Sequence, residues 1–327
     1  MSKAVALEVS QTVEAGPVKK RDLHLGDRVF FWILRGVATS VILLLAALTL
    51  YLFRLSIPAF QTFGAKFLIS LEWNPVSEVF GAGPFIYGTV VSSLLALCIS
   101  VPVSLGVSLF LNELAPKKLA DTMGFLVEML AAIPSVVYGL WGIFVLAPWL
   151  RTTVQPLLGK TFGFIPLFQG PPFGVGMLAA GLVLAIMITP TISAICKEVF
   201  RAIPDHQREA SLALGATRWE MIHMSVIQTA RSGILGAVIL GLGRAMGETM
   251  AVTMVIGNRA EIDISLFAPA QTMASVIANE YAEASSQIHL SSLAAVGLSL
   301  FVVSLLINAM ARFVVHRVDS RSAKAAH

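Results

Sequence analysis

Charged residues are scarce in this sequence. Only 13% of its 327 residues are Asp, Glu, Lys or Arg, whereas 56% are hydrophobic and the mean hydropathy is +0.81. Because a soluble domain carries about 25% charged residues, this scarcity excludes a soluble globular fold and predicts an integral membrane protein. The net charge of +4 becomes informative only when the lysines and arginines are placed along the chain.

Cysteines and the common catalytic motifs are also few or missing. The two cysteines, Cys98 and Cys196, lie within apolar stretches, which excludes a disulfide framework and a cysteine metal site. The sequence contains neither H-E-x-x-H nor G-x-S-x-G. The segment LLGKT at 157–161 ends like a phosphate-binding loop, but Val154 stands where that loop needs its first glycine. We therefore expect no catalytic residue, no metal site and no ATP bound by this chain, and an intramembrane enzyme is the least favoured interpretation.

Six apolar runs are long enough to cross a bilayer, which takes about 20 residues. Pro102, Pro134 and Pro190 fall inside these runs, where neighbouring helices can satisfy the freed backbone groups. The predicted fold class is an all-α integral membrane protein with six transmembrane helices. The runs occupy residues 30–53, 85–111, 123–150, 174–196, 234–256 and 293–315.

The basic residues between the runs predict the orientation. Sixteen of the 23 lysines and arginines lie in the N-terminal segment, the second and fourth connections and the tail, whereas five lie in the other connections. The positive-inside rule then places both termini in the cytoplasm, and the basic balance does not indicate nucleic-acid binding. The expected organisation is a cytoplasmic segment at 1–29, a first helix and external loop at 30–84, a transmembrane core at 85–316 that includes a cytoplasmic loop at 197–231, and a cytoplasmic tail at 317–327.

Two charges interrupt the fifth run, which reads GLGRAMGETMAVTMVIG at 241–257. Arg244 and Glu248 are four residues apart, so a continuous helix places them on one face, where pairing lowers the cost of burial. A guanidinium stays protonated and offers flat, paired donors that suit an oxyanion. The pattern therefore predicts either an anion pathway or gate at these residues or a static salt bridge between helices.

Small residues surround the two charges. Gly243 and Gly247 form G-x-x-x-G, a device that lets two membrane helices approach closely. Thr249 and Thr253 have hydroxyls that can donate to an anion or to a backbone carbonyl of their own helix, and the second is favoured for each residue alone. We include Thr249 with Arg244 and Glu248 in the predicted pathway.

The predicted cytoplasmic loop contains a short amphipathic helix. Asp205 after Pro204 is a suitable N-cap and Gly215 a suitable terminator, with HQREASLAL between them. Such a helix either lies on lipid or binds a partner protein.

The pattern Glu209-Ala210-Ser211, then three residues, then Gly215, resembles the EAA loop of ABC importer permeases. In that family the loop forms a coupling helix that docks on the ATP-hydrolysing subunit. The family's I-x-L-P ending is absent here, because residues 225–228 read SVIQ.

Longer segments carry a more specific resemblance. They are YGTVVSSLLALCISVPVSLGVSLFLNELAP at 87–116, LAAIPSVVYGLWGIFVLAP at 130–148, LAAGLVLAIMITP at 178–190, GLGRAMGETMAVTMVIGN at 241–258 and ANEYAEA at 278–284. Together they are similar to the PstC-type permeases of phosphate ABC transporters over about residues 80–315. The first 30 residues or so contribute nothing to this similarity.

The resemblance implies the rest of a transport system. It implies a type I ABC importer fold in the bacterial inner membrane, in which six helices surround half of a phosphate pathway. The implied partners are a PstA-type second permease, two PstB-type ATPase subunits that bind ATP and Mg²⁺, a PstS-type phosphate-binding protein outside and a sensor-kinase regulatory system. The family's pathway arginine and glutamate correspond to Arg244 and Glu248. Two alternatives stay open at this point: a permease for sulfate, molybdate or phosphonate, and a phosphate-sensing scaffold for a signalling kinase.

Overall fold

The computed structural model describes residues 25–325, so most of the predicted segment 1–29 and the end of the predicted tail lie outside the described residues. Within the described part the protein is all-helical, and its only β-type contacts are two isolated bridges. The chain divides into two compact units, residues 1–50 and 51–327, which are described separately. This architecture confirms the predicted all-α membrane fold class.

The first unit consists, in its described part, of the N-terminal portion of one long helix. This helix, α1, spans Leu25–Phe63 and therefore begins before the apolar run at 30–53. Its large apolar side chains are exposed, with Trp32 at 64% and Leu44 at 66%. A helix that presents apolar side chains on all sides is suited to lipid.

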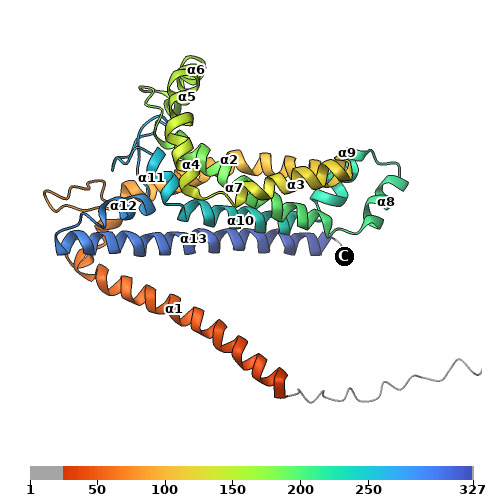
Figure 1. The fold of residues 1–327 in the computed structure, drawn as a ribbon, viewed down its shortest axis with the longest axis horizontal. Coiled ribbons are helices and arrows are strands. Elements are labelled where there is room, and N and C mark those ends of the chain that lie inside the picture. The colour runs from red at the N-terminus through yellow and green to blue at the C-terminus, as the bar shows by residue number, and fades with distance from the viewer. Residues whose placement is uncertain (1–24, 326–327) are drawn as a thin grey trace, which may run out of the picture. The chain divides into compact units, whose positions relative to one another are not determined.

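The second unit holds the remaining helices. The longer ones are α2 (Gly83–Leu109), α3 (Lys117–Ala131), α7 (Met177–Arg201), α10 (Arg231–Gly247) and α13 (Gln287–Ala325). The shorter ones are α4 (Ser135–Trp141), α5 (Ala147–Trp149), α6 (Gln155–Phe162), α8 (Asp205–Ala213), α9 (Arg218–Met221), α11 (Met250–Val255) and α12 (Met273–Glu280). Figure 1 shows α2, α3, α7, α10 and α13 running side by side, with α8 and α9 at one end of the bundle and α12 at the other. The last turns of α13 lie at the same end as α8, as the predicted cytoplasmic loop and tail require.

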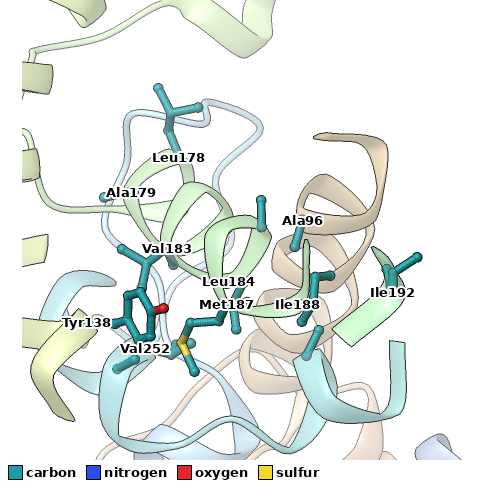
Figure 2. Packing of buried hydrophobic residues seen from close by; sticks show 14 of the residues in the cluster. Ala96, Tyr138, Leu178, Ala179, Val183, Leu184, Met187, Ile188, Ile192 and Val252 are labelled. Carbon is teal, nitrogen blue, oxygen red and sulfur yellow. The ribbon is translucent and has the colours of Figure 1, made fainter. Parts of the chain in front are cut away.

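Helix α7 is the centre of the bundle. It packs against α2, α3, α10 and α11, and 67% of its most apolar window is buried. In Figure 2, Met187 lies beside Tyr138 and Val252 on one side of α7, and Ala96 of α2 lies across the helix from them. Gly181 permits the contact with α2, because a Cβ there would lie 2.4 Å from Leu95. An apolar helix that is covered on several sides positions its neighbours as one rigid body.

A second cluster of buried side chains closes the end of the bundle near α12. It contains Phe67, Phe80 and Phe85, with Trp73 packed against Phe85 at a ring distance of 4.8 Å. The carboxylate of Glu280 accepts hydrogen bonds from Trp73 Nε1 at 2.9 Å and meets His289 Nε2 at 3.0 Å. The cluster therefore fixes the beginning of α13 against the segment before α2.

Two predicted membrane runs differ from the structure. The run at 123–150 contains a break: α3 ends at Ala131, Pro134 precedes α4, and the chain is helical from Ser135 to Phe162. Pro134 lacks an N–H and disfavours helical backbone at the residue before it, which explains the break. Among residues 25–325, five helices are long and apolar enough to cross a membrane, and a sixth is obtained if the pair Arg218–Ile227 and Arg231–Gly247, bent by 70°, counts as one span. The second difference, in the run at 234–256, lies in the candidate site.

Candidate functional site

The fifth run is interrupted at Glu248, the second of its two charged residues. Helix α10 ends at Gly247, Glu248 adopts an extended backbone with φ −70° and ψ 127°, and α11 begins at Met250. The prediction of a continuous helix with Arg244 and Glu248 paired on one face is therefore wrong. No ion pair joins these two side chains in the part of the chain that the structure describes. Helices broken within a membrane expose backbone groups only where they line a cavity or another protein surface.

Arg244 is held by few contacts. Its Nη1 donates a 3.2 Å hydrogen bond to Thr191 Oγ1 on α7, which is its only hydrogen bond among residues 25–325. It lies in the last turn of α10, where a cation interacts favourably with the helix dipole. Its side chain is exposed, and its charge acts on the phenol of Tyr138 on α4. A guanidinium has five N–H donors, so most of those of Arg244 are free to bind another group.

Glu248 and Thr249 organise the start of α11. Oε1 of Glu248 accepts a 3.3 Å hydrogen bond from the backbone N–H of Ala251. Thr249 donates a 3.4 Å hydrogen bond to the carbonyl of Gly247, and Thr253 donates one of 2.7 Å to the carbonyl of Thr249. The prediction that the threonines bond to backbone carbonyls is confirmed. Glu248 caps α11 and does not neutralise Arg244 in this conformation.

The two glycines beside Arg244 do not pack against this chain. A Cβ built at Gly243 or Gly247 would meet nothing within 4 Å. The close approaches lie elsewhere: a Cβ at Gly139 would lie 2.6 Å from Met254, and one at Gly241 would lie 2.7 Å from Ile192. Within residues 25–325 no helix packs closely on Gly243 or Gly247, so helix packing through the G-x-x-x-G pair stays a prediction that a second chain would have to fulfil.

The short amphipathic helix predicted in the loop is α8. It ends at Ala213, and Gly215 has φ +88°, with its N–H bonded to Leu212 and that of Ala216 bonded to Ser211. This Schellman geometry requires a left-handed residue, which glycine supplies. Pro204 occupies the N-cap position, so the prediction of Asp205 as N-cap is displaced by one residue.

The residues of the EAA pattern divide by exposure. Glu209 and Ala210 are exposed, whereas Ser211 is half-buried, and its hydroxyl bonds to the carbonyl of Gln207 at 2.9 Å and to the hydroxyl of Ser225. The sequence SVIQ at 225–228, in place of the family ending, begins in the π-helical turn Ile222–Ile227. The first of these residues, Ser225, thus fixes α8 through its hydrogen bond with Ser211.

A capping box follows α8. Thr217 Oγ1 accepts a 3.3 Å hydrogen bond from the backbone N–H of Glu220, and the Glu220 carboxylate accepts bonds of 2.8 Å from the Thr217 N–H and hydroxyl. These two bonds, the backbone one foremost, lower the pKa of Glu220 below its ordinary value. The box fixes where the chain turns back towards the membrane.

Sequence reasoning missed two residues beside Arg244. Thr191 follows Pro190 within an apolar run, and Tyr138 follows the break at Pro134. A polar side chain next to a proline in a membrane run is a signal for Thr191, whereas Tyr138 lies four residues after Pro134 and carries no such signal. The hydrogen bond of Arg244 to Thr191 and its electrostatic effect on Tyr138 depend on the packing of α4, α7 and α10, which no local pattern contains.

The comparisons with known proteins agree with the fold. The family model described as binding-protein-dependent transport system inner membrane component matches residues 103–320. The PstC phosphate transport system permease protein of Mesorhizobium japonicum is 49% identical over 306 residues, which cover 92% of this chain and 94% of that protein. A probable phosphate transport system permease protein PstC of Methanocaldococcus jannaschii is 37% identical over 281 residues, covering 84% and 89%.

Solved structures give the same architecture. A chain of a bacterial alginate ABC transporter, in complex with an alginate pentasaccharide-bound periplasmic protein, has a TM-score of 0.61 at 17% identity, covering 90% of this chain and 97% of that one. A chain of the inward-facing MetNI methionine ABC transporter has a TM-score of 0.53 at 18% identity, covering 72% and 94%. At these identities the likeness concerns the fold alone, which is that of an ABC importer membrane subunit.

Proposed function

Because this chain belongs to the PstC family of phosphate transport permeases, we propose that it is the transmembrane subunit of an ATP-driven importer of inorganic phosphate. The observation that carries the proposal is Arg244, a cation with one hydrogen bond at a broken membrane helix. Its free donors suit the oxygens of phosphate. The binding is weak enough for release because few groups converge on the ion.

In this proposal the pathway opens alternately to the two sides of the membrane. Phosphate contacts Arg244 when the pathway admits it, and the charge of Glu248, capping α11 nearby, opposes tight binding. Thr249 contributes backbone geometry at the break. The permease itself carries out no chemistry, because ATP and Mg²⁺ bind to partner subunits.

The proposed partners follow from the family and from two surfaces of the chain. A PstA-type permease covers the face of α10 that carries Gly243 and Gly247 and completes the pathway. Two PstB-type ATPase subunits bind the membrane subunits, one of them at the exposed face of α8, and a PstS-type protein delivers phosphate at the end that carries α12. Both termini are then cytoplasmic, as the distribution of basic residues predicts.

Three of the acidic side chains at the end that carries α12 have partners, whereas Glu283 is exposed. Arg259 pairs with Glu261 at 2.8 Å, Asp263 accepts the N–H of Ser265, and Glu280 is bound to the buried cluster. A cavity of about 550 Å³ lies beside these residues, between the loop at 166–173 and that at 259–269. This surface suits the proposed contact with the phosphate-binding protein.

The test is ATP hydrolysis by the complex assembled with these partners in proteoliposomes. We expect ATPase activity that depends on phosphate-loaded binding protein, together with uptake of labelled phosphate. Sulfate, molybdate and a phosphonate at equal concentration serve as competitors, because an arginine alone does not distinguish tetrahedral oxyanions. Preferential transport of one of these anions over phosphate would contradict the proposed substrate.

A further inference from the structure

Arg208 on α8 uses its donors almost completely. Its Nη1 donates to the carbonyl of Ile203 at 2.6 Å and to Asp205 Oδ1 at 3.1 Å, and its Nη2 donates to the carbonyl of Phe200 at 2.8 Å. Its Nη2 and Nε also donate to Glu113 Oε1, at 2.9 and 3.3 Å. The side chain of Arg208 is 14% exposed and that of Glu113 only 6%. This is an enclosed ion pair at the edge of the bundle.

The ion pair joins α8 to the end of α2, because Arg208 and Glu113 are 95 positions apart in the sequence, and Arg208 also bonds to the end of the preceding helix α7. Glu113 lies in the π-helical turn Phe110–Leu114 that ends α2, and it also accepts a 2.6 Å bond from Asn112 Nδ2. The two carbonyls belong to Phe200, in the last turn of α7, and to Ile203, the second residue after that helix, where a helix end presents negative partial charge. One guanidinium therefore connects α8 to the ends of both α2 and α7.

Helix α8 is held on its second flank by Ser211 and Ser225, yet its outward surface is open. Glu209 and Ala210 are exposed, and Leu214, just after the helix, is 90% exposed. A helix can transmit the movement of a partner protein to the bundle when its outer surface is free to bind the partner and its inner surface is bonded to the bundle. Because α2 and α7 pack against each other, a displacement of α8 that keeps the ion pair intact moves both helices.

We propose that Arg208 and Glu113 are positioning residues that transmit movement from the ATPase to the transmembrane helices. The ion pair makes α8 and the adjoining ends of α2 and α7 move together, so ATP hydrolysis is converted into opening and closing of the pathway. A planar guanidinium bonded at several points resists sliding in a way that an apolar contact does not. This proposal rests on the proposed function, in which α8 docks on an ATPase.

The test measures phosphate transported per ATP hydrolysed by the assembled complex in proteoliposomes. Glu113→Gln keeps the size and an acceptor oxygen but removes the charge, and Arg208→Lys keeps the charge but removes the planar fork. We expect each variant to hydrolyse ATP at close to the wild-type rate while transport per ATP falls about tenfold. The matched control is Glu198→Gln, which removes the exposed Arg201–Glu198 pair, with side chains 65% and 68% exposed, at the same end of α7.

A double variant separates transmission from folding. Glu113→Leu combined with Arg208→Met replaces the buried pair by apolar side chains, a change that commonly preserves stability. We expect this variant to assemble and hydrolyse ATP without matching transport. Wild-type transport per ATP in the assembled variants overturns the transmission role, and so does loss of assembly in the double variant, since it shows that the pair serves folding. A wild-type complex without phosphate-dependent ATPase activity contradicts the proposed function instead.

Discussion

Two arginines in this protein have opposite surroundings. Arg208, at the α8 end, donates to two backbone carbonyls and two carboxylates, and its side chain is 14% exposed. Arg244, at the break between α10 and α11, is exposed and donates once, to Thr191. The same side chain is structural where the protein satisfies its donors and is available to a ligand where it does not.

The surroundings of Glu113 and Glu248 show the same contrast. Glu113 is bonded to Arg208 and is 6% exposed, whereas Glu248 forms no ion pair with Arg244 among the described residues and accepts the N–H of Ala251 in α11. Burying Arg208 without Glu113 would leave an unpaired charge. Arg244 avoids that cost because a second permease and an aqueous pathway, in the proposed complex, cover its side of the bundle.

The largest expected effect is that of removing the available arginine. Arg244→Gln removes the charge-assisted bonds to phosphate, each of which contributes roughly 1.5–3 kcal/mol, so uptake falls roughly tenfold to hundredfold. Thermal unfolding of the permease changes little, because only one 3.2 Å bond is lost. Uptake of labelled phosphate by assembled complexes checks the prediction.

Thr191→Val is the matched control for that experiment. It removes the partner of Arg244 within this chain but leaves the guanidinium free, so uptake falls by less than about fivefold. Wild-type phosphate uptake by an assembled Arg244→Gln complex would contradict the role of Arg244 in the pathway and would leave it only its interaction with the dipole of α10.

The enclosed arginine has the larger effect on stability. Arg208→Met leaves Glu113 buried without its charge partner, which costs roughly 3–5 kcal/mol. Arg201→Met removes the exposed pair with Glu198 and costs about 0–1 kcal/mol. Thermal unfolding of the two purified variants gives the comparison. Equal shifts would show that enclosure does not distinguish these pairs.

Much of the fold could be predicted from composition and apolar runs. The runs that correspond to α2, α7 and α13 are long and uniformly apolar, so their mean hydropathy alone identifies them as membrane helices. Gly215 was also predictable, because a helix that ends in a left-handed residue nearly requires glycine. These features depend on local chemistry alone.

The break between α10 and α11 could not be predicted in the same way, because no proline marks it as Pro134 marks the break before α4. A break of two residues hardly changes the average hydropathy of a run. The sequence of residues 234–256 therefore predicts one continuous helix. The position of α11 is set by packing against α4, where Gly139 allows Ala251 and Met254 to approach. The prediction that Arg244 pairs with Glu248 was wrong for this reason, because a spacing of four residues brings two side chains together only within a continuous helix.

The third prediction tests the charge of Glu248 apart from its capping role. Glu248→Gln keeps an acceptor for the Ala251 N–H, so thermal unfolding of the permease stays unchanged. Without the negative charge, phosphate leaves Arg244 more slowly, and we expect uptake to fall about fivefold. Glu248→Ala loses both cap and charge and also lowers stability by about 1 kcal/mol. Unchanged uptake with Gln would limit Glu248 to capping.

A smaller effect is expected from substitution of Gly243, and it appears only when the second permease is present. Gly243→Ala meets nothing within 4 Å in this chain, so the isolated permease keeps its stability while association with the second permease weakens. Gly88→Ala is the contrasting variant, because its Cβ would lie 2.1 Å from the backbone oxygen of Gln271 and destabilises the chain itself by roughly 1–3 kcal/mol. Co-purification and thermal unfolding separate the two outcomes. Normal association of Gly243→Ala would place the partner contact elsewhere.

The smallest expected effect concerns an exposed carboxylate at the α8 end. Hydrogen bonds from Thr217 lower the pKa of Glu220, so the folded state favours the ionised form. The capping box is therefore fully formed above the ordinary glutamate pKa and is lost as the pH falls through the lowered, folded-state value. Hydrogen exchange at the Thr217 amide, corrected for its intrinsic rate, reports this loss. Glu220→Gln removes the titration, and a pH dependence that persists in that variant would assign it to another group.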